Sequence, residues 1–230
     1  MSKAEFKKNF RYFDWIMVSF VTLLLCANLI GAAKVVQIGG LSFGGTLIFF
    51  PLTYLFGDIL TEVYGYKRSR KVIWAGFLAM GFASFVSVLV VWLPPAPGWE
   101  HQQAIETVFK TTPRLAFGSM LAYFAGEFLN SYVLAKMKVW TEGRWLWTRL
   151  VVSTVAGEAV DTLIIYPIAF YGVWSNELLI KVMITSYIVK VLWEVFAIPL
   201  TLPLVRYLKR IENEDYYDRN TNFSPFSLKH

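Results

Sequence analysis

The sequence predicts an all-α integral membrane protein with six transmembrane helices, and three observations support that fold class. Of the 230 residues, 56% are hydrophobic and only 17% are charged, whereas a soluble domain carries about 25% charged residues. The apolar residues form runs of about 20, the length that a helix needs to cross a bilayer. Lys and Arg gather in every second connection, which is typical of loops that alternate between two sides of a membrane.

Six apolar runs are long enough to span ~30 Å of hydrocarbon at ~1.5 Å per residue. Each is expected to be helical, because in lipid a backbone must satisfy its hydrogen bonds within its own segment. Residues 1–210 are therefore predicted to form one transmembrane domain, and the polar tail, residues 211–230, is expected to be cytoplasmic and poorly ordered. The six predicted spans cover about residues 15–36, 41–64, 71–93, 114–135, 150–172 and 179–207.

The basic residues set the predicted orientation. Residues 37–40 and 172–178 contain no Lys or Arg, and residues 94–113 contain only Lys110. The other connections and both termini are basic, so the positive-inside rule places the termini in the cytoplasm and requires an even number of spans. The basic clusters are Lys3, Lys7, Lys8 and Arg11; Lys67, Arg68, Arg70 and Lys71; Lys136, Lys138, Arg144 and Arg149; and Arg206, Lys209 and Arg210.

This distribution accounts for the net charge of +6, so no nucleic-acid partner is predicted. The single Cys26 cannot form an internal disulfide. His101 lies in a connection and His230 is the last residue, so the sequence shows no histidine metal site. We expect neither a metal nor a cofactor.

Acidic side chains occur inside the predicted spans. A charge near the bilayer centre costs at least ~2.5–3.5 kcal/mol on insertion scales, so a protein without a polar interior would not carry several. Neighbouring acids and polar residues are three or four positions apart, which puts them on one helix face. We expect these faces to turn inward around a shared cavity. The residues concerned are Asp58, Glu62, Glu127, Asn130, Glu158, Asp161, Lys190 and Glu194.

Three of these faces begin alike, with a glycine followed by an acid and, three positions later, a second polar residue. The segments are 57–61 (GDILT), 126–130 (GEFLN) and 157–161 (GEAVD). Matches of five residues are too short to establish an internal repeat. The pattern, which we call the Gly-acid motif, indicates that the same local arrangement is used three times.

Four of the charged residues have structural explanations as well. Lys190 and Glu194 are four apart on one helix and can neutralise each other as an ion pair. Asp58 and Glu62 lie near the basic residues 67–71, where they can form interfacial salt bridges that set the topology. Both explanations compete with a role in binding.

Glu127, Glu158 and Asp161 are harder to explain structurally, because they lie nearer mid-span and have no basic partner on their own helices. Asn28 can bind substrate or hydrogen-bond to a neighbouring helix. A buried carboxylate cluster can bind a cation, relay protons, or accept two N–H bonds from a flat heterocycle such as guanine. Composition does not choose among these three.

Residues 50–70, FPLTYLFGDILTEVYGYKRSR, form a long and unusual run. In this run the sequence resembles the queuosine precursor transporters, a bacterial family within the vitamin uptake transporters. Residues 126–131 (GEFLNS) and 157–162 (GEAVDT) fit the same family. The resemblance covers roughly residues 13–210 and leaves out the polar tail.

The resemblance implies a six-helix carrier in the bacterial inner membrane. Its expected substrates are the 7-cyano and 7-aminomethyl forms of 7-deazaguanine, which are precursors of the tRNA modification queuosine. The family is thought to be similar in fold to the substrate-binding subunits of energy-coupling-factor transporters. No dedicated ATPase module and no cofactor are expected; membrane lipid surrounds the protein, and a homo-oligomeric state is left open.

This substrate suits the residues in the spans. A carboxylate can accept the N1–H and 2-amino donors of a deazaguanine together, and a second acid can hold an aminomethyl cation. By hypothesis, Glu127 or Glu158 binds the guanine edge, and Asp161 or Asn130 holds the opposite side. The remaining wall would be Asn28 and Glu194 with the aromatic residues Tyr54 and Trp193, whereas Asp58, Glu62 and Lys190 are assigned to gating or structure.

Two alternatives stay open. The first is a carrier for another vitamin or nucleobase, or a binding subunit that docks an ATPase through the small residues between 75 and 84. The second is an intramembrane enzyme whose paired acids hold a metal, although no His-Glu-x-x-His and no Gly-x-Ser-x-Gly motif is present. The sequence does not show whether protons drive the transport.

Overall fold

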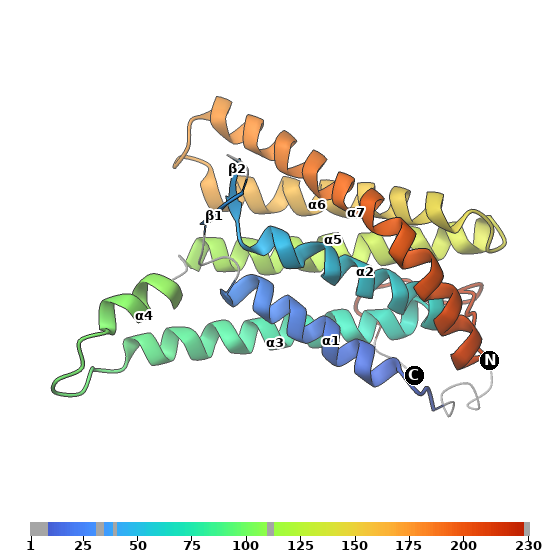
Figure 1. Ribbon diagram of the computed structural model, residues 1–230, viewed down its shortest axis with the longest axis horizontal. Coiled ribbons are helices and arrows are strands. Elements are labelled where there is room, and N and C mark those ends of the chain that lie inside the picture. Colours follow the sequence, from blue (N-terminus) through green and yellow to red (C-terminus); the bar gives the residue numbers. More distant parts are fainter. Residues whose placement is uncertain (1–8, 31–34, 39–40, 110–112, 228–230) are drawn as a thin grey trace.

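The computed structural model describes residues 9–30, 35–38, 41–109 and 113–227. The long helices lie side by side along the longest axis of the molecule, and a short helix and a hairpin lie at one end (Figure 1). The elements are α1 (Phe13–Leu25), the π-helix η2 (Cys26–Ile30), β1 (Val35–Ile38), β2 (Leu41–Gly44), α2 (Thr46–Tyr64), α3 (Tyr66–Trp92), α4 (Gln102–Phe109), α5 (Pro113–Trp140), α6 (Leu146–Phe170) and α7 (Asn176–Glu212).

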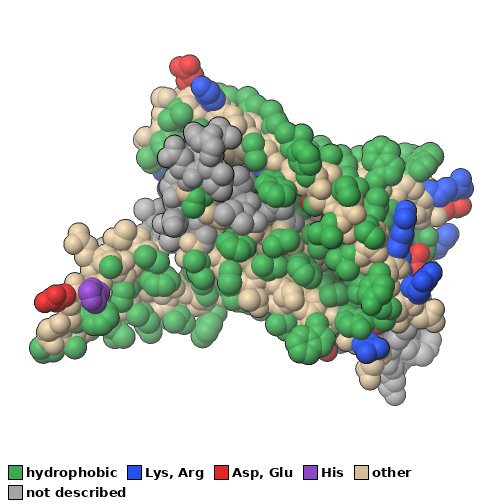
Figure 2. Space-filling model, in the orientation of Figure 1, with side chains coloured by type: hydrophobic (Ala, Val, Ile, Leu, Met, Phe, Trp, Pro, Cys, Tyr) green, Lys and Arg blue, Asp and Glu red, His purple; other side chains and the backbone are tan. Residues whose placement is uncertain are grey.

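The other end of the bundle collects four features of the chain: the start of α1, the turn between α2 and α3, the turn between α5 and α6, and the end of α7 (Figure 1). Direct contacts tie these together. The backbone N–H of Arg11 donates to Glu212 Oε2 over 2.9 Å, and that of Tyr216 donates to the Val63 carbonyl over 3.3 Å. We call this the basic end, because most of the exposed Lys and Arg side chains on the face shown in Figure 2 lie here.

Four helical segments of the described chain are long and apolar enough to cross a membrane: Phe13–Ile30, Tyr66–Trp92, Leu146–Phe170 and Asn176–Glu212. Hydrophobic side chains cover the middle of the molecule between its two ends (Figure 2). The protein is therefore a multi-pass, helical membrane protein. The other two predicted spans correspond to α2 and α5, the helices that contribute Asp58, Glu62 and Glu127 to the interior.

The boundary between the first two predicted spans is wrong. The last described helical residue before β1 is Ile30, and residues 35–38 form that strand, which pairs antiparallel with β2 from Val35↔Gly44 to Ile38↔Leu41. The β-branched residues of β1 favour a strand, and the two glycines at 39 and 40 are a two-residue hairpin sequence. Apolar composition alone did not distinguish this hairpin from a helix end.

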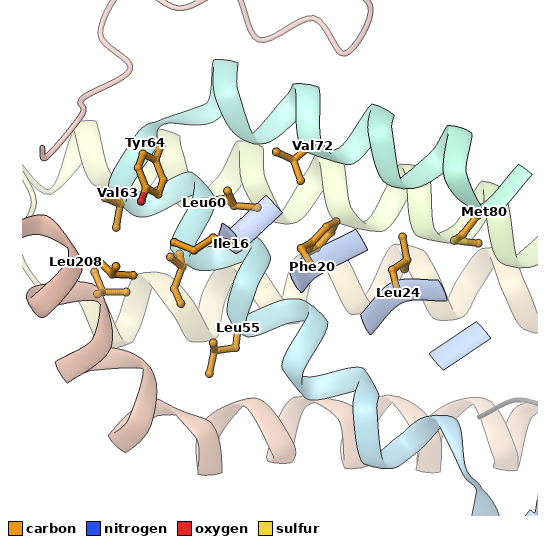
Figure 3. Close-up of a cluster of buried hydrophobic side chains, with 12 residues drawn as sticks. Ile16, Phe20, Leu24, Leu55, Leu60, Val63, Tyr64, Val72, Met80 and Leu208 are labelled. Carbon is orange, nitrogen blue, oxygen red and sulfur yellow. The ribbon is translucent and has the colours of Figure 1, made fainter. Parts of the chain in front are cut away.

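An apolar cluster joins α1, α2, α3 and α7 near the basic end (Figure 3). Phe20, Ile59, Leu60 and Val63 are each at most 1% exposed. Lipid tails are as apolar as these side chains, so close van der Waals packing holds the helices together here. The cluster comprises Ile16, Phe20, Leu24, Leu55, Ile59, Leu60, Val63, Tyr64, Val72, Met80, Val205 and Leu208.

Helices α5 and α6 pack closely against each other through two glycines. A Cβ on Gly157 would lie 2.8 Å from the Asn130 Cβ and 2.9 Å from the Gly126 carbonyl oxygen. A Cβ on Gly126 would lie 3.0 Å from the Gly157 carbonyl oxygen and 3.1 Å from the Asp161 Cβ. Each glycine thus faces the residue four positions after the other glycine, so the two Gly-acid motifs pack against each other reciprocally.

The polar tail was expected to be poorly ordered, and this expectation is wrong. The Asp218 carboxylate accepts the Tyr66 N–H over 2.9 Å, and Arg70 donates to the carbonyls of Asn222 and Ser224 over 2.8 and 2.7 Å. The Tyr216 ring lies over Gly65, whose φ of 86° and lack of a Cβ make room for it. The tail therefore packs across the α2–α3 turn.

The Gly157 contact gives a stability prediction. Gly157→Ala should lower stability by about 1–3 kcal/mol, because the new methyl meets backbone and a Cβ that cannot move aside. Gly81→Ala is the matched control, since its Cβ would meet only the terminal methyl of Met120 at 3.1 Å. Thermal unfolding in detergent measures both variants. Equal melting temperatures for the two would contradict the close α5–α6 contact.

Candidate functional site

The interior of the bundle contains a group of polar side chains contributed by α2, α5, α6 and α7, which we call the polar core. Its members lie on different helices but interact with one another, and seven of the eight are at most 8% exposed. The eighth, Lys190, has a side chain that is 13% exposed. The polar core comprises Tyr54, Asp58, Glu127, Asn130, Glu158, Asp161, Lys190 and Glu194.

Lys190 supplies the positive charge of this group. Its Nζ on α7 lies 2.5 Å from Asp161 Oδ2 and 3.0 Å from Glu158 Oε2, both on α6. The ion pair that sequence spacing offered between Lys190 and Glu194 is therefore replaced by a pair between helices. The two acids of the third Gly-acid motif share one lysine, which leaves this side of the core with a net negative charge.

Glu127 lies at the centre of the polar core. Its carboxylate occupies the space that a side chain at position 57 would fill, because a Cβ on Gly57 would lie 2.2 Å from Glu127 Oε1. That oxygen accepts no hydrogen bond from any described residue. Glu158, Asp161 and Glu194 are close enough to repel its charge. Glu127 Oε1 is thus a buried acceptor that has no donor in the described part of the chain.

Tyr54 is the aromatic residue that the structure brings to this site. It is 6% exposed, and its hydroxyl bonds to Glu158. Trp193, by contrast, is 43% exposed on the outer surface of α7, outside the polar core. Asn28 lies in η2, where its amide donates to the Leu24 carbonyl of its own helix over 2.9 Å. The structure thus assembles the predicted acids without the predicted Trp193 and Asn28.

Asp58 and Glu62 are one helical turn apart on α2, yet they belong to different groups. Asn130 donates to Asp58 Oδ1 over 2.9 Å. The carboxyl groups of Asp58 and Glu194 lie against each other. Asp58 therefore belongs to the polar core, although sequence reasoning placed it with Glu62 as a gating or structural residue.

Glu62 anchors a second group, which we call the end network. Arg149 holds its carboxylate in a two-pronged ion pair of 2.5 and 3.1 Å, and Lys209 lies 2.6 Å from Oε1. Lys138 donates to the Glu62 carbonyl over 2.6 Å and pairs with Asp215 at 2.5 Å. The network thus joins α2, α5, α6, α7 and the tail.

The predicted partners of Glu62, the basic residues 67–71, are not the ones it uses. Its partners are basic residues that the sequence indicated only for orientation: Lys138, Arg149 and Lys209. Glu62 and Arg149 are both fully buried. A buried carboxylate needs a cation from a neighbouring helix. Basic residues at the same end of the other predicted spans were therefore the signal in the sequence that could have identified Arg149.

Asp215 ties the tail to the end network. Partial burial alone raises the pKa of Asp215, but the hydrogen bonds and charges of Lys138 and Lys209 outweigh it and hold this pKa below its usual value. A folded-state pKa below the unfolded value means that the contribution to stability is present at neutral pH. It is lost as the pH falls through the lowered pKa of Asp215.

Ionisable side chains enclosed by apolar helices mark a membrane transport protein. The comparisons agree with this class. Residues 44–204 match the family described as "Putative vitamin uptake transporter". The match includes the whole polar core and ends before Lys209 and Asp215 of the end network.

Similar curated proteins narrow this broad family to one group of transporters. The chain is 30% identical to the "Probable queuosine precursor transporter" of Bacillus subtilis over 80% of both chains. It is 26% identical to the "Queuosine precursor transporter" of Escherichia coli over 66% of this chain and 67% of the relative. No solved structure matches the chain significantly. The chain belongs to the queuosine precursor transporter family, and it is therefore a transporter and not an enzyme.

The end network gives a second stability prediction. Arg149→Met should destabilise the protein by about 3–5 kcal/mol, because it leaves a buried carboxylate without its bidentate partner. Arg144→Met is the control, since Arg144 and its partner Glu142 are 73% and 69% exposed. Thermal unfolding in detergent compares the two variants. A melting temperature for Arg149→Met equal to that of the control would show that the network is not a structural anchor.

Proposed function

We propose that this protein imports 7-deazaguanine precursors of queuosine, the 7-cyano and 7-aminomethyl forms, across the bacterial inner membrane. The names of the relatives support the substrate class. The observation that carries the proposal is Glu127 Oε1, a buried carboxylate oxygen that no described residue satisfies. An unsatisfied buried acceptor is costly, so this oxygen is suited to a ligand that donates.

The chemistry of a deazaguanine matches this acceptor. Its N1–H and 2-amino groups point the same way and can bond to the two oxygens of one carboxylate, as a guanidinium does. Glu127 takes this role. Glu158 is already engaged by Tyr54 and Lys190, so it helps to position the Tyr54 ring for stacking on the base. Asp161 is the second acid, placed to meet an aminomethyl cation or the carbonyl side.

The polar core is closed in this structure, so transport requires the helices to part and form an acid-lined cavity. We assign six spans, namely α1 with η2, α2, α3, α5, α6 and α7. The basic end then faces the cytoplasm by the positive-inside rule. The end network closes that side, because Glu62 joins three neighbouring helices there. Release into the cytoplasm would require these ion pairs to open.

A carrier for another vitamin or nucleobase is the second candidate, supported by the broader description of the matched family. The ATPase-dependent version of this alternative needs a free face of small residues on α3. Gly76 is instead buried against α1 and α5, where a Cβ would lie 2.5 Å from the Tyr123 hydroxyl and 2.9 Å from Leu24. We therefore propose a carrier that works without a dedicated ATPase module.

Uptake of labelled precursor tests the assignment in cells that cannot make queuosine themselves. Glu127→Gln should lower uptake by about tenfold or more, because a hydrogen bond to a charged group is worth about 1.5–3 kcal/mol and ~1.4 kcal/mol is tenfold. Glu142→Gln, at an exposed position, should leave uptake unchanged. Immunoblotting of membranes checks that both variants are present. Wild-type uptake by Glu127→Gln would remove Glu127 from the binding site.

A further inference from the structure

The polar core carries more acid than its own bases can balance. Its five carboxyl groups, on Asp58, Glu127, Glu158, Asp161 and Glu194, face the single ammonium group of Lys190 among the described residues of the core. An uncompensated buried charge costs several kcal/mol, so the remaining negative charge must be neutralised when the core is closed. Protons and cationic ligands are the available means.

The contact between Asp58 and Glu194 shows where one proton belongs. Asp58 is 0% exposed and Glu194 is 2% exposed, and their carboxyl groups lie against each other. Asp58 Oδ1 is satisfied by Asn130. Asp58 Oδ2 and Glu194 Oε1 accept nothing from any described donor. Two carboxylates in contact repel, whereas one proton held between them makes a hydrogen bond that satisfies both.

We propose that Asp58 and Glu194 form the proton site of a proton-coupled transporter, which takes up one proton with each substrate from outside and releases it to the cytoplasm. This inference rests on the proposed function and adds its energy source. The step is a simple transfer: a hydronium ion outside gives a proton to the carboxyl pair and becomes water, and a water inside accepts that proton and becomes hydronium. No other bond forms or breaks.

Glu127 connects this pair with the substrate. From α5, the ionisable group that approaches the pair is Glu127, and the neutral amide of Asn130 lies beside it. Glu158 and Asp161 of α6 lie on the far side of Glu127, where they bind Lys190. With a proton on the pair, Glu127 can stay ionised and accept the guanine edge. Loss of the proton would raise the charge of the pair from one negative charge to two beside Glu127, which disfavours the closed, loaded core. Substrate and proton are therefore bound together and released together.

The same two helices carry the proton pair and the cytoplasmic ion pairs. Glu62 follows Asp58 by one turn on α2, about 6 Å along the axis, and Lys209 lies farther along α7 than Glu194. Glu62 and Lys209 are 2.6 Å apart at their nearest charged atoms. A movement of α2 away from α7 would thus open the end network and expose the carboxyl pair to the same side. This geometry links proton release to opening.

Purified protein in liposomes tests the inference with the labelled 7-cyano form, which is uncharged and therefore insensitive to membrane potential. With the potential clamped by potassium and valinomycin, an inward proton gradient of one pH unit should drive substrate accumulation up to about tenfold over the outside concentration, which is the limit for one proton per substrate. A pH dye trapped inside should report acidification when substrate is added. A protonophore should reduce accumulation to the equilibrium level.

A double variant tests the residues. Asp58→Asn with Glu194→Gln should lose gradient-driven accumulation and substrate-induced proton flux, but it should keep exchange of labelled for unlabelled substrate, which needs no net proton movement. Glu142→Gln should keep all three. If the double variant does not fold, Glu194→Gln alone is measured in the same way, since Asp58 keeps its bond to Asn130.

The outcomes separate the two proposals. Net uptake of the 7-cyano form by the wild type without proton flux would overturn the proton site and leave the proposed function standing. Absence of exchange in the wild type would overturn the substrate assignment and the inference with it. Proton flux that persists in the Asp58→Asn, Glu194→Gln double variant, or in Glu194→Gln alone where the double variant does not fold, would overturn the assignment to Asp58 and Glu194.

Discussion

The reciprocal contact between Gly126 and Gly157 is the constraint on which the polar core depends. Neither glycine has a side chain at the α5–α6 crossing, so the two backbones lie too close together there to leave room for a Cβ at either position. The residue after each glycine is a glutamate, and a polar side chain follows three positions later. The crossing therefore concentrates two pairs of polar groups in one small volume. Larger residues at either position would separate the pairs and admit lipid or empty space between them.

The Gly-acid motif of α2, residues 57–61, uses its glycine differently. Gly57 on α2 does not pack against another backbone but leaves space for the Glu127 carboxylate. The shared pattern thus serves two purposes: Gly126 and Gly157 let two helices pack closely, and Gly57 makes room for a buried acid. It does not require an internal repeat. This also explains why Asp58, the acid of that motif, finds its partners on α5 and α7 instead of at the α5–α6 crossing.

Sequence reasoning identified the buried acids but not their partners. Helical spacing grouped Glu158 with Asp161 correctly, because residues three apart share a face whatever surrounds them. It offered Lys190 to Glu194, whereas the structure gives Lys190 to α6, since spacing along one helix carries no information about its neighbours. The hairpin and the ordered tail were missed for a similar reason. Hydropathy does not separate a short apolar strand from a helix end, and the tail is held largely by backbone groups that any sequence possesses.

The extent of the family match bears on how closure is achieved. Residues 44–204 contain every member of the polar core, so the chemistry of the core lies within the region shared with the family. Lys209 and Asp215 lie outside it, yet both bind to the end network, one at Glu62 and the other at Lys138. Closure at the basic end therefore combines Glu62, Lys138 and Arg149, which lie within the matched region, with Lys209 and a tail that lie beyond it. The polar core thus lies wholly within the region that defines the family, whereas the closure at the basic end depends partly on residues outside it.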